Sequence, residues 1–435
     1  MSNRGDKPSD FDAFERLPER KEPTIGLRSS VKNISISSPT SPIGSPASPI
    51  SPPIGVVRVY SNSESIDSLN QRMLQGNDKR FVEWPKLGFP DPEDPDLRRL
   101  EYAWKSKQGD KLELEAEKVW QEFLLNSNKV NNRQKQCQQL IRKHGIPSKY
   151  RPRVWMEIRG VDKKMKENEG YYDSILDVHK NTPCVSAEQI QLDLHRTFPQ
   201  HPLFFENPVP TSGRSQMQRI LTAYSWRNPH VSYCQSLNYI VGILLLHYSE
   251  EQSFWMLVSI LEELLPANFY NPQLKGVRVD SRVLDEMLKD RLPKLHQHFF
   301  NCHIEVQTFC TGWFMRLFVD IFPLETTMRI WDLLFSEGSK VLFRTILAFL
   351  KISENDLLGC SHMGEMLHYL NAAPIRQYDY NILVKTCFSF YSLKRKNLED
   401  ARDRCTKIVE AEIRELQIRR DAARQRMMSM NMTIA

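Results

Sequence analysis

Two short polar groups in this chain carry side chains that are suited to hydrolytic chemistry. The first is Ile190-x-x-Asp193-x-x-Arg196, and the second, further along the chain, is Tyr233-x-Gln235. An arginine supplies a permanent positive charge that can neutralise a transition state, and a glutamine amide can orient an attacking water. These are the two contributions that hydrolysis of a bound GTP most needs from protein side chains.

The spacing of the first group predicts how its side chains are held. Ser186-Ala187-Glu188-Gln189 has the pattern of a capping box, which predicts a helix that begins there. In that helix Ile190 points inward, while Asp193 and Arg196 share one edge, so the carboxylate can hold the guanidinium in one rotamer. The alternative is an ordinary surface pair, worth roughly a few tenths of a kcal/mol.

The second group is predicted to lie in a loop. Pro229, Ser232 and Ser236 favour irregular backbone around it. Side chains two residues apart point the same way only in extended or turn backbone, so Tyr233 and Gln235 could act together in a loop, whereas on a helix they would diverge. The alternative is that both side chains simply satisfy backbone groups of the loop.

A third landmark lies upstream, in Arg151-Pro152-Arg153-Val154-Trp155. The three groups, in this order, resemble the signature of the TBC domain family of Rab GTPase-activating proteins. Further landmarks that resemble the family are Thr197-Phe198-Pro199 with Phe204, Trp313-Phe314 with Leu317-Phe318 and Pro323, and Arg329-Ile330-Trp331-Asp332 with Gly338 and Phe343. The resemblance covers roughly residues 143–349, with looser helices to about residue 390, and residues 77–124 resemble the growth-hormone-regulated TBC proteins.

The resemblance implies an all-α, TBC-type helical domain that accelerates GTP hydrolysis by a Rab-family small GTPase. Members of the family insert an arginine and a glutamine in trans into a Rab protein that carries GTP and Mg²⁺. By resemblance, Arg196 is the arginine finger and Gln235 the glutamine finger. The supporting residues are Asp193, Tyr233 and Ile190 and, bracing the catalytic helix near the site, Arg151 and Trp155. The chain would then be a GTPase activator, not an enzyme in its own right, with no cofactor of its own and a role in vesicle trafficking and intracellular protein transport.

The sequence departs from the family pattern around these motifs. Serines stand at positions 232 and 236, where many members carry glycine, Leu237 replaces the usual methionine, and Pro152 stands where glycine is common. Glycine would permit positive φ or close backbone approach, so two added Cβ atoms could alter the loop or restrict which Rab fits. The alternative function is therefore a non-catalytic adaptor or Rab effector whose loop fails to deliver Gln235. A third hypothesis is an all-α structural protein unrelated to GTPases. It requires that all three motifs resemble the family, in the same order, by chance.

Composition argues against several other classes of protein. The 435 residues are 40% hydrophobic and 26% charged, which suits a folded core. The 59 basic and 53 acidic residues are largely interleaved, so the net charge of +6 does not indicate binding to nucleic acid. Eight scattered cysteines favour reduced thiols and a cytoplasmic location over disulfides.

Neither a membrane span nor a site for metal or free nucleotide is expected. Residues 1–17 lack the apolar core of a secretory signal, and the longest apolar run, 240–246, falls far short of the roughly 20 residues that cross a bilayer, so association with endomembranes would be peripheral. The cluster of His296, His298, Cys302 and His303 has no accompanying Cys-x-x-Cys and is explained by a helical stripe. The chain also lacks a Gly-x-x-x-x-Gly-Lys-Ser/Thr loop.

Changes in composition divide the chain into four predicted regions. We expect a disordered Ser/Pro-rich tail over 1–76, an extended segment and helices over 77–132, the TBC domain over 133–392, and a charged helix and tail over 393–435. The tail cannot bury enough apolar surface to offset its ordering entropy. Its five Ser-Pro steps are either targets of a proline-directed kinase or part of a solvated spacer.

Helical periodicity dominates the domain, with almost no strict alternation of apolar and polar residues, so we expect it to be all-helical. Ser249-Glu250-Glu251-Gln252 predicts a second capping box. The C-terminal helix is expected to pack back onto the domain at its start, along an apolar stripe. The residues of this stripe are Ile408, Val409, Ile413 and Leu416. A calmodulin-type or coiled-coil partner for the helix is an open alternative.

Overall fold

The computed structural model describes residues 85–89, 91–125, 133–204, 212–390, 393 and 395–434. The chain divides into two units, Met1–Ser61 and Asn62–Ala435, and every described residue belongs to the second unit. The predicted tail and its five Ser-Pro steps lie outside the described residues, so both stay predictions. The predicted region boundaries near residues 76, 132 and 392 also stay predictions.

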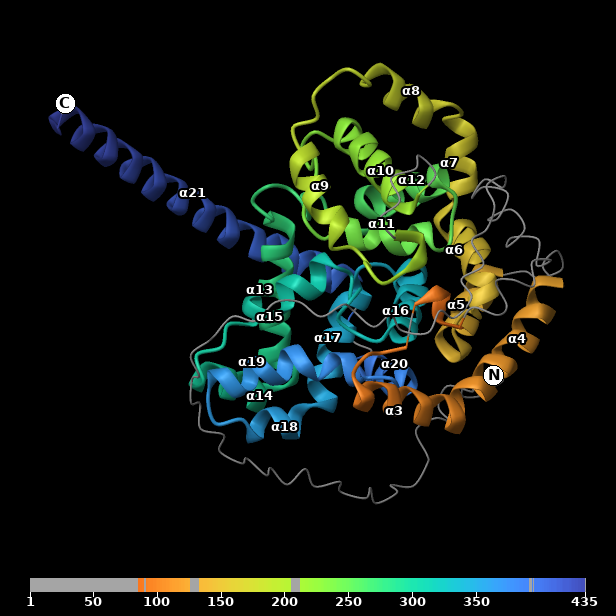
Figure 1. Cartoon of the computed structure of the whole chain (residues 1–435). Helices are drawn as coiled ribbons and strands as arrows, with labels where there is room; N and C mark the ends of the chain where they lie inside the picture. Colours follow the sequence, from red (N-terminus) through yellow and green to blue (C-terminus); the bar gives the residue numbers. More distant parts are fainter. Residues whose placement is uncertain are drawn as a thin grey trace, which may run out of the picture. The chain divides into compact units, whose positions relative to one another are not determined.

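All regular structure in the described part of the chain is helical (Figure 1). The first helices are α3 (Pro95–Trp104), α4 (Asp110–Leu125), α5 (Arg133–His144), α6 (Arg151–Arg159), α7 (Val161–Glu167), α8 (Tyr171–Val178) and α9 (Ala187–His195). The middle helices are α10 (Gly213–Arg227), α11 (Leu237–Leu245), α12 (Glu250–Ser259), α13 (Lys275–Arg291), α14 (Pro293–Asn301) and α15 (Val306–Met315). The last helices are α16 (Leu324–Glu337), α17 (Lys340–Ile352), α18 (Glu354–Gly359), α19 (Met363–Ala372), α20 (Tyr380–Ser389) and α21 (Arg395–Ile434). The prediction of an all-helical domain is confirmed.

Short irregular helices join these elements. Turns of 3-10 helix lie at Pro85–Gly88, Ser148–Tyr150, Pro202–Phe204 and Pro374–Arg376, and π-helical segments at Lys105–Gly109 and Ile260–Leu264. No helix of the described residues is both long enough and apolar enough to span a bilayer.

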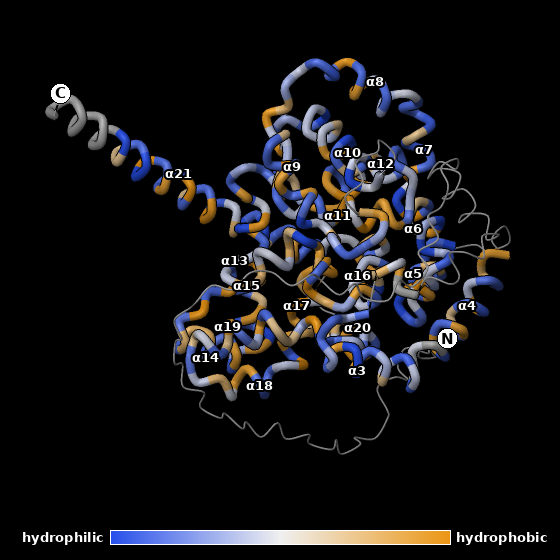
Figure 2. Tube along the Cα trace, in the orientation of Figure 1, coloured by the Kyte–Doolittle hydropathy of each residue, from blue (hydrophilic) through white to orange (hydrophobic). Residues whose placement is uncertain are grey.

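Two helices lie at the centre of the packing. α11 is buried at every position except Tyr239, which is half-buried, and it packs against α9, α10 and α12. α17 is buried from Val341 to Leu350 and packs against α16 and α20. Figure 2 shows hydrophobic residues gathered on these inner helices. Because a helix that is apolar on every side belongs in a core, α11 is a fixed platform for the residues that lie on its first turn.

The helices that precede the domain pack into the same unit. Trp120 of α4 is fully buried, and its indole N–H donates to the carbonyl of Gly145 at 2.6 Å. Trp104 of α3 meets the ring of Tyr380 edge-on, with 5.3 Å between centroids. The helices expected between residues 77 and 132 are therefore present and are held against the rest of the second unit by aromatic residues.

One of the two predicted capping boxes is confirmed and the other is wrong. At α12 the Ser249 hydroxyl accepts from the backbone N–H of Gln252, and the Gln252 side chain accepts from the N–H of Ser249. Ser186 precedes α9, but its side chain makes no capping bond. Its Oγ lies 2.8 Å from the Oγ of Ser232 instead, so the hydroxyl ties the start of α9 to a distant loop.

The C-terminal helix packs along α13 at its start, as expected. Within residues 395–424 of α21, the buried residues are Leu398, Ala401, Cys405 and Val409. In the predicted stripe Val409 is buried and Ile413 half-buried, whereas Ile408 is 46% and Leu416 44% exposed. The predicted stripe is therefore confirmed at Val409 and Ile413, which continue the buried face that begins at Leu398. It is wrong at Ile408, which lies beside that face, and at Leu416, which is on the face but exposed.

A buried ion pair joins α13 and α21. The carboxylate of Asp280 is fully buried, and Arg402 donates to its two oxygens from Nε and Nη2, each at 2.7 Å. Arg402 also donates from Nη1 to the hydroxyl of Ser339 at 3.2 Å. Removal of one partner from a buried pair leaves the other charge uncompensated, which is strongly destabilising.

The variant Arg402→Ala should therefore lower the free energy of unfolding by about 3 kcal/mol, measured by chemical denaturation. Arg404→Ala is the matched control on the same helix, because the Arg404 side chain is 62% exposed and pairs at the surface with Glu286. The control should lose less than about 1 kcal/mol. Equal losses in the two variants would contradict the importance of the buried pair.

Candidate functional site

The first predicted group lies at the end of α9. Ile190 is fully buried, as its spacing predicts, and Asp193 is 2% exposed. Arg196 is the C-cap residue of the helix, and its side chain is 44% exposed. The carboxylate is thus deeper than the helix edge on which we expected it, while the guanidinium reaches the surface.

Asp193 accepts hydrogen bonds from three other side chains. Arg196 donates from Nε to Oδ1 at 2.9 Å, and its Nη2 lies 2.8 Å from the same oxygen. Tyr233 donates its hydroxyl to Oδ2 at 2.5 Å. Gln189 donates from Nε2 to Oδ1 at 3.3 Å. Because a buried carboxylate needs several donors, Asp193 fixes both the arginine and the tyrosine.

Tyr233 reaches Asp193 from the loop that connects α10 and α11, so the prediction of irregular backbone around Tyr233 and Gln235 is confirmed. Burial, together with the hydrogen bond to Asp193, raises the pKa of the Tyr233 phenol far above its ordinary value. The phenol is therefore neutral and acts as a hydrogen-bond donor.

Gln235 lies against the guanidinium of Arg196 at the surface. The hydrogen-bonding pattern assigns the amide oxygen to the side that faces Arg196, where it accepts from Nη1 at 2.9 Å and also from Nη2. Gln235 is exposed. The structure thus brings together the two side chains that the sequence places 39 positions apart, at 196 and 235.

The loop that carries Gln235 has two residues in left-handed backbone. Ser232 has a φ of 52° and Ser236 a φ of 94°. Ser232 is also held by the hydrogen bond between its hydroxyl and that of Ser186. The loop therefore keeps the backbone that glycine would favour, at the expense of steric strain.

Asn238, on the first turn of α11, ties the loop to the end of α9. Its Oδ1 accepts from the backbone N–H of Ser236 at 3.0 Å, and its Nδ2 donates to the hydroxyl of Thr197 at 2.7 Å. Thr197 in turn donates to the carbonyl of Asp193 at 2.7 Å. Sequence reasoning missed Asn238. The available signal was a polar residue at the start of an otherwise apolar run, where burial forces it to find partners.

Close side-chain packing against α11 also positions the turn that follows Arg196. Phe198 has a φ of 45° and rests on α11 at Gly242. A Cβ atom at Gly242 would lie 2.7 Å from Cε2 of Phe198 and 3.3 Å from Cγ2 of Thr197. Only a glycine lets the turn sit this close to α11, so Gly242 is a second position that sequence reasoning missed.

Arg151 and Trp155 lie in a buried cluster around Asp332 of α16, and their predicted role near the site stays a prediction. Trp155 donates its indole N–H to Asp332 of α16 at 3.0 Å, and Arg151 pairs with the same oxygen at 3.3 Å. The Trp155 ring packs against His247, just beyond the C-terminal end of α11, with 5.0 Å between centroids. These residues brace α16 and the end of α11 opposite to Asn238.

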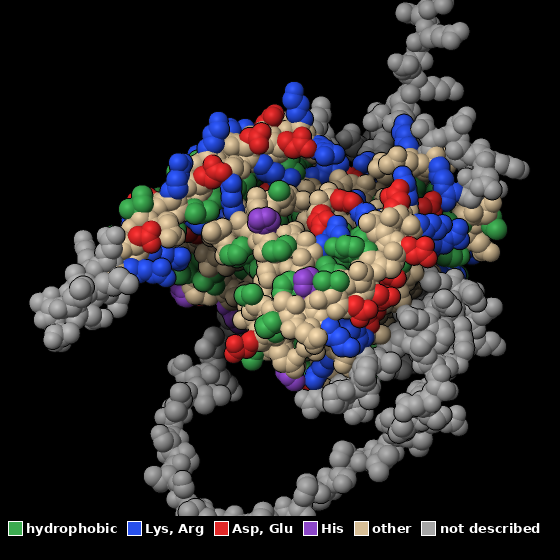
Figure 3. All heavy atoms as spheres, turned by 90° about the horizontal axis from the view of Figure 1, so that it is seen from above, with side chains coloured by type: hydrophobic (Ala, Val, Ile, Leu, Met, Phe, Trp, Pro, Cys, Tyr) green, Lys and Arg blue, Asp and Glu red, His purple; other side chains and the backbone are tan. Residues whose placement is uncertain are grey.

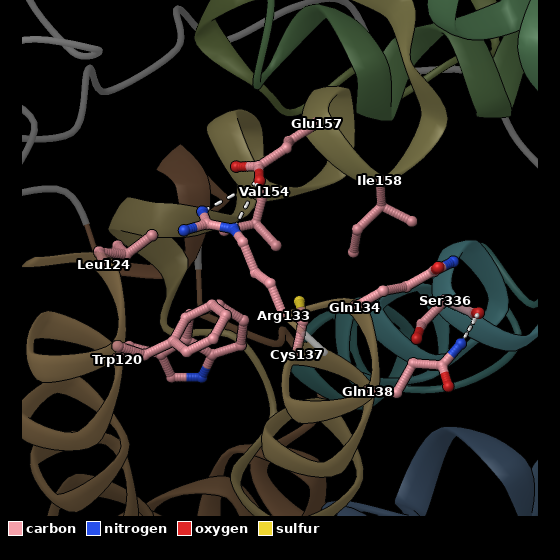
Figure 4. Close-up of a pocket in the computed structure, with 11 residues that line it drawn as sticks. Trp120, Leu124, Arg133, Gln134, Cys137, Gln138, Val154, Glu157, Ile158 and Ser336 are labelled. Atoms are coloured by element: carbon pink, nitrogen blue, oxygen red, sulfur yellow. Dashed lines mark hydrogen bonds and ion pairs between the residues drawn. The ribbon is translucent and has the colours of Figure 1, made fainter. Parts of the chain in front are cut away.

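A cavity of about 340 Å³ lies elsewhere, between α4, α5 and α6 (Figure 4). Trp120, Cys137 and Val154 are among the residues that line it, and Arg133 and Glu157 form an ion pair there at 3.0 Å. None of its lining residues belongs to the group around Asp193. The site at Arg196 is thus a surface site, separate from this cavity.

The surface around Arg196 suits a macromolecular partner. Leu192 lies one helical turn before Arg196 and is 62% exposed. Figure 3 looks onto the face that carries α8, α9 and α10, where hydrophobic side chains lie among charged ones. A half-exposed guanidinium beside an exposed amide could approach an anionic group and a water that a partner presents.

Comparisons with known proteins show the family to which the whole domain is similar. The model of the Rab-GTPase-TBC domain family matches residues 148–358. Growth hormone-regulated TBC protein 1-A of Danio rerio is 34% identical over 248 residues, which are 57% of this chain and 68% of that protein. Small G protein signaling modulator 3 of Mus musculus is 35% identical over 240 residues, and the match spans 32% of its length.

Solved structures have the same fold. The TBC domain of the Chlamydomonas flagellar RabGAP superposes with a TM-score of 0.60 and 31% identity, covering 70% of this chain and 98% of that domain. The Ypt/Rab-GAP domain of Gyp1p superposes with a TM-score of 0.54 and 22% identity over 65% of this chain and 99% of that domain, which shows the fold alone. The motifs, the helical architecture and these relatives lead to one conclusion: the chain belongs to the Rab-GTPase-TBC domain family.

Proposed function

We propose that this chain is a GTPase-activating protein for a Rab-family small GTPase. It supplies Arg196 and Gln235 in trans to GTP held by the partner. The observation that carries the proposal is the meeting of these two side chains at the surface, over the buried carboxylate of Asp193. Family membership supports it, and the similar Chlamydomonas domain is described as a RabGAP.

The two fingers have separate roles in the proposed reaction. Arg196 contacts the oxygens of the transferring phosphoryl group and neutralises the charge that develops there. Gln235 orients the attacking water, for which its amide offers both a donor and an acceptor. GTP and Mg²⁺ belong to the partner. When the partner docks, the hydrogen bond between Gln235 and Arg196 is exchanged for bonds to water and phosphate.

Asp193 and Tyr233 act as positioning residues, because they contact the fingers and not the substrate. Asp193 limits the rotamers of Arg196 before the partner arrives, so less conformational entropy is lost when the transition state forms. Tyr233 holds the loop that carries Gln235 against the same carboxylate.

This activity would end the GTP-bound state of a Rab and thereby act in vesicle trafficking and intracellular protein transport. The chain would work in the cytoplasm and reach endomembranes through its membrane-bound partner. The substrate Rab can be identified by screening purified GTP-loaded Rabs for faster GTP hydrolysis with catalytic amounts of the chain.

A non-catalytic adaptor or Rab effector is the second candidate, favoured by the two serines in left-handed backbone. The activator is the better supported of the two, because the strained loop still places Gln235 against Arg196. Substoichiometric protein distinguishes the two functions. An activator shortens the lifetime of GTP on many Rab molecules in turn, whereas an effector leaves that lifetime unchanged or longer.

The variant Arg196→Ala should lower stimulated GTP hydrolysis about 10³-fold or more, and Gln235→Ala should have a comparable effect. Single-turnover assays on the responsive Rab measure both, and circular dichroism should show that both variants stay folded. Arg153→Ala, which removes an exposed arginine of α6, is the control and should keep full activity. Hydrolysis by Arg196→Ala at the wild-type rate would reject the assignment of the arginine finger.

The strained loop generates a separate test. Ser236→Gly should raise the free energy of unfolding by about 0.5 to 1 kcal/mol, because glycine adopts the φ of 94° without a Cβ clash. Ser232→Gly relieves similar strain but loses the hydrogen bond to Ser186, worth about 1 kcal/mol, so its net change should be near zero. Urea denaturation measures both. A destabilised Ser236→Gly variant would show that this residue is not strained.

A further inference from the structure

The turn that follows Arg196 is covered by residues that precede the family match at 148–358. His201, within this turn, is 4% exposed, and its Nε2 lies 2.8 Å from the carbonyl oxygen of Leu87. Its other ring nitrogen, Nδ1, accepts from the backbone N–H of Leu203 at 3.1 Å. Nδ1 is thus the acceptor, so Nε2 carries the proton and donates to Leu87. We call residues 87–89 and 91–93 the N-terminal clasp.

An aromatic contact reinforces this hydrogen bond. The ring of Phe89 meets that of Phe198 edge-on, with 5.1 Å between centroids and an angle of 88° between planes. The same ring lies 4.8 Å from the imidazole of His201. Edge-to-face pairs at these distances are favourable beyond their burial of apolar area. Phe89 therefore contacts the turn at two separate residues, Phe198 and His201.

The clasp is itself fixed at its far end. Glu93 accepts from Nε2 of Gln200 at 2.7 Å, which adds a third contact with the turn. Arg98 of α3 donates from Nε and Nη2 to the carbonyl of Pro92 at 3.1 and 2.9 Å, and Tyr102 of α3 donates to Asp91 at 2.8 Å. The clasp is thus held in place by hydrogen bonds from α3.

The turn is consequently held from two sides. α11 supports it at Gly242, where Phe198 makes its close approach, and the clasp covers it through His201, Phe89 and Glu93. Arg196 is the residue directly before this turn, at the C-cap of α9. Loss of the cover would free the backbone that sets the direction of the guanidinium, even with its bond to Asp193 intact.

We propose that the N-terminal clasp positions the arginine finger by ordering the turn at residues 197–203. Phe89 is the principal positioning residue, because it contacts the turn at both Phe198 and His201. The ordering of the turn is a property of this chain alone. Its catalytic consequence rests on the proposed function.

Hydrogen exchange tests the ordering without any partner. The amides of Thr197, His201, Leu203 and Phe204 report on the turn, since each donates a hydrogen bond within it or to the end of α9. In Phe89→Ala these amides should exchange about ten-fold faster than in the wild type, while those of α11 stay unchanged. Phe89→Leu, which keeps part of the apolar contact, should restore part of the protection. Unchanged exchange of the turn in Phe89→Ala would overturn the proposal.

Kinetics with the responsive GTPase test the positioning. Phe89→Ala should lower kcat about ten-fold and leave KM within about two-fold of the wild type. A misdirected Arg196 stabilises the transition state less well, whereas it has little effect on binding of the GTPase. Phe123→Ala is the matched control: Phe123 is also half-buried, also precedes residue 148, and packs on Trp120. The control should keep both kcat and KM.

The hydrogen-exchange and kinetic experiments together distinguish failure of the clasp proposal from failure of the proposed function. If the turn exchanges faster in Phe89→Ala but kcat matches that of Phe123→Ala, the clasp orders the turn without positioning the finger, and the proposal is wrong. If the wild-type chain stimulates no GTPase, the proposed function fails, and the exchange of the turn still decides whether the clasp orders it.

Discussion

The carboxylate of Asp193 joins two parts of the chain that must act together. It accepts from Arg196 at the end of α9 and from Tyr233 in the loop before α11, while it is 2% exposed. In a site with little water such bonds are strong, and a carboxylate left without them would be costly to bury. The same interaction therefore stabilises the loop and orients the guanidinium. Gln235 completes the group from the loop side through its hydrogen bonds with Arg196, so the positions of both side chains depend on one buried carboxylate.

The scaffold explains how this charge stays in place. α11 is buried on almost every side, and its first turn presents Asn238 to the end of α9, while Gly242 lets the following turn lie close. At the opposite end of α11, Trp155 packs on His247 and donates to Asp332 of α16. α11 is thus held at both ends, and its packing in the core keeps the residues of the site in fixed positions. Because the core is closely packed, a displacement at either end of α11 is transmitted along the helix. For the same reason, one added Cβ atom at Gly242 would displace its neighbours.

The sequence predicts some of these features well because they depend on local spacing. Periodicity is a property of neighbouring residues, so the helical class and the pairing of Asp193 with Arg196 follow from it. Other features depend on partners far along the chain. The hydroxyl of Ser186 bonds to Ser232, 46 residues away, so the local capping pattern was misleading. The buried face of α21 was predicted only in part, for a similar reason. The predicted stripe included Val409 but missed the earlier turns of the same face, from Leu398, because their few apolar residues stand among charged ones and only packing against α13 identifies them.

A double-mutant cycle between Asp193 and Tyr233 tests the central claim, that one carboxylate positions both fingers. The measured quantity is the kcat of GTP hydrolysis by the responsive Rab for Asp193→Ala, Tyr233→Phe and the double variant. Each single variant should lower kcat, and Tyr233→Phe should add almost nothing in the Asp193→Ala background, which corresponds to a coupling energy of about 1 to 3 kcal/mol. The account would be contradicted if the fold-decrease in kcat of the double variant equalled the product of the two single fold-decreases. The tyrosine and the carboxylate would then act independently.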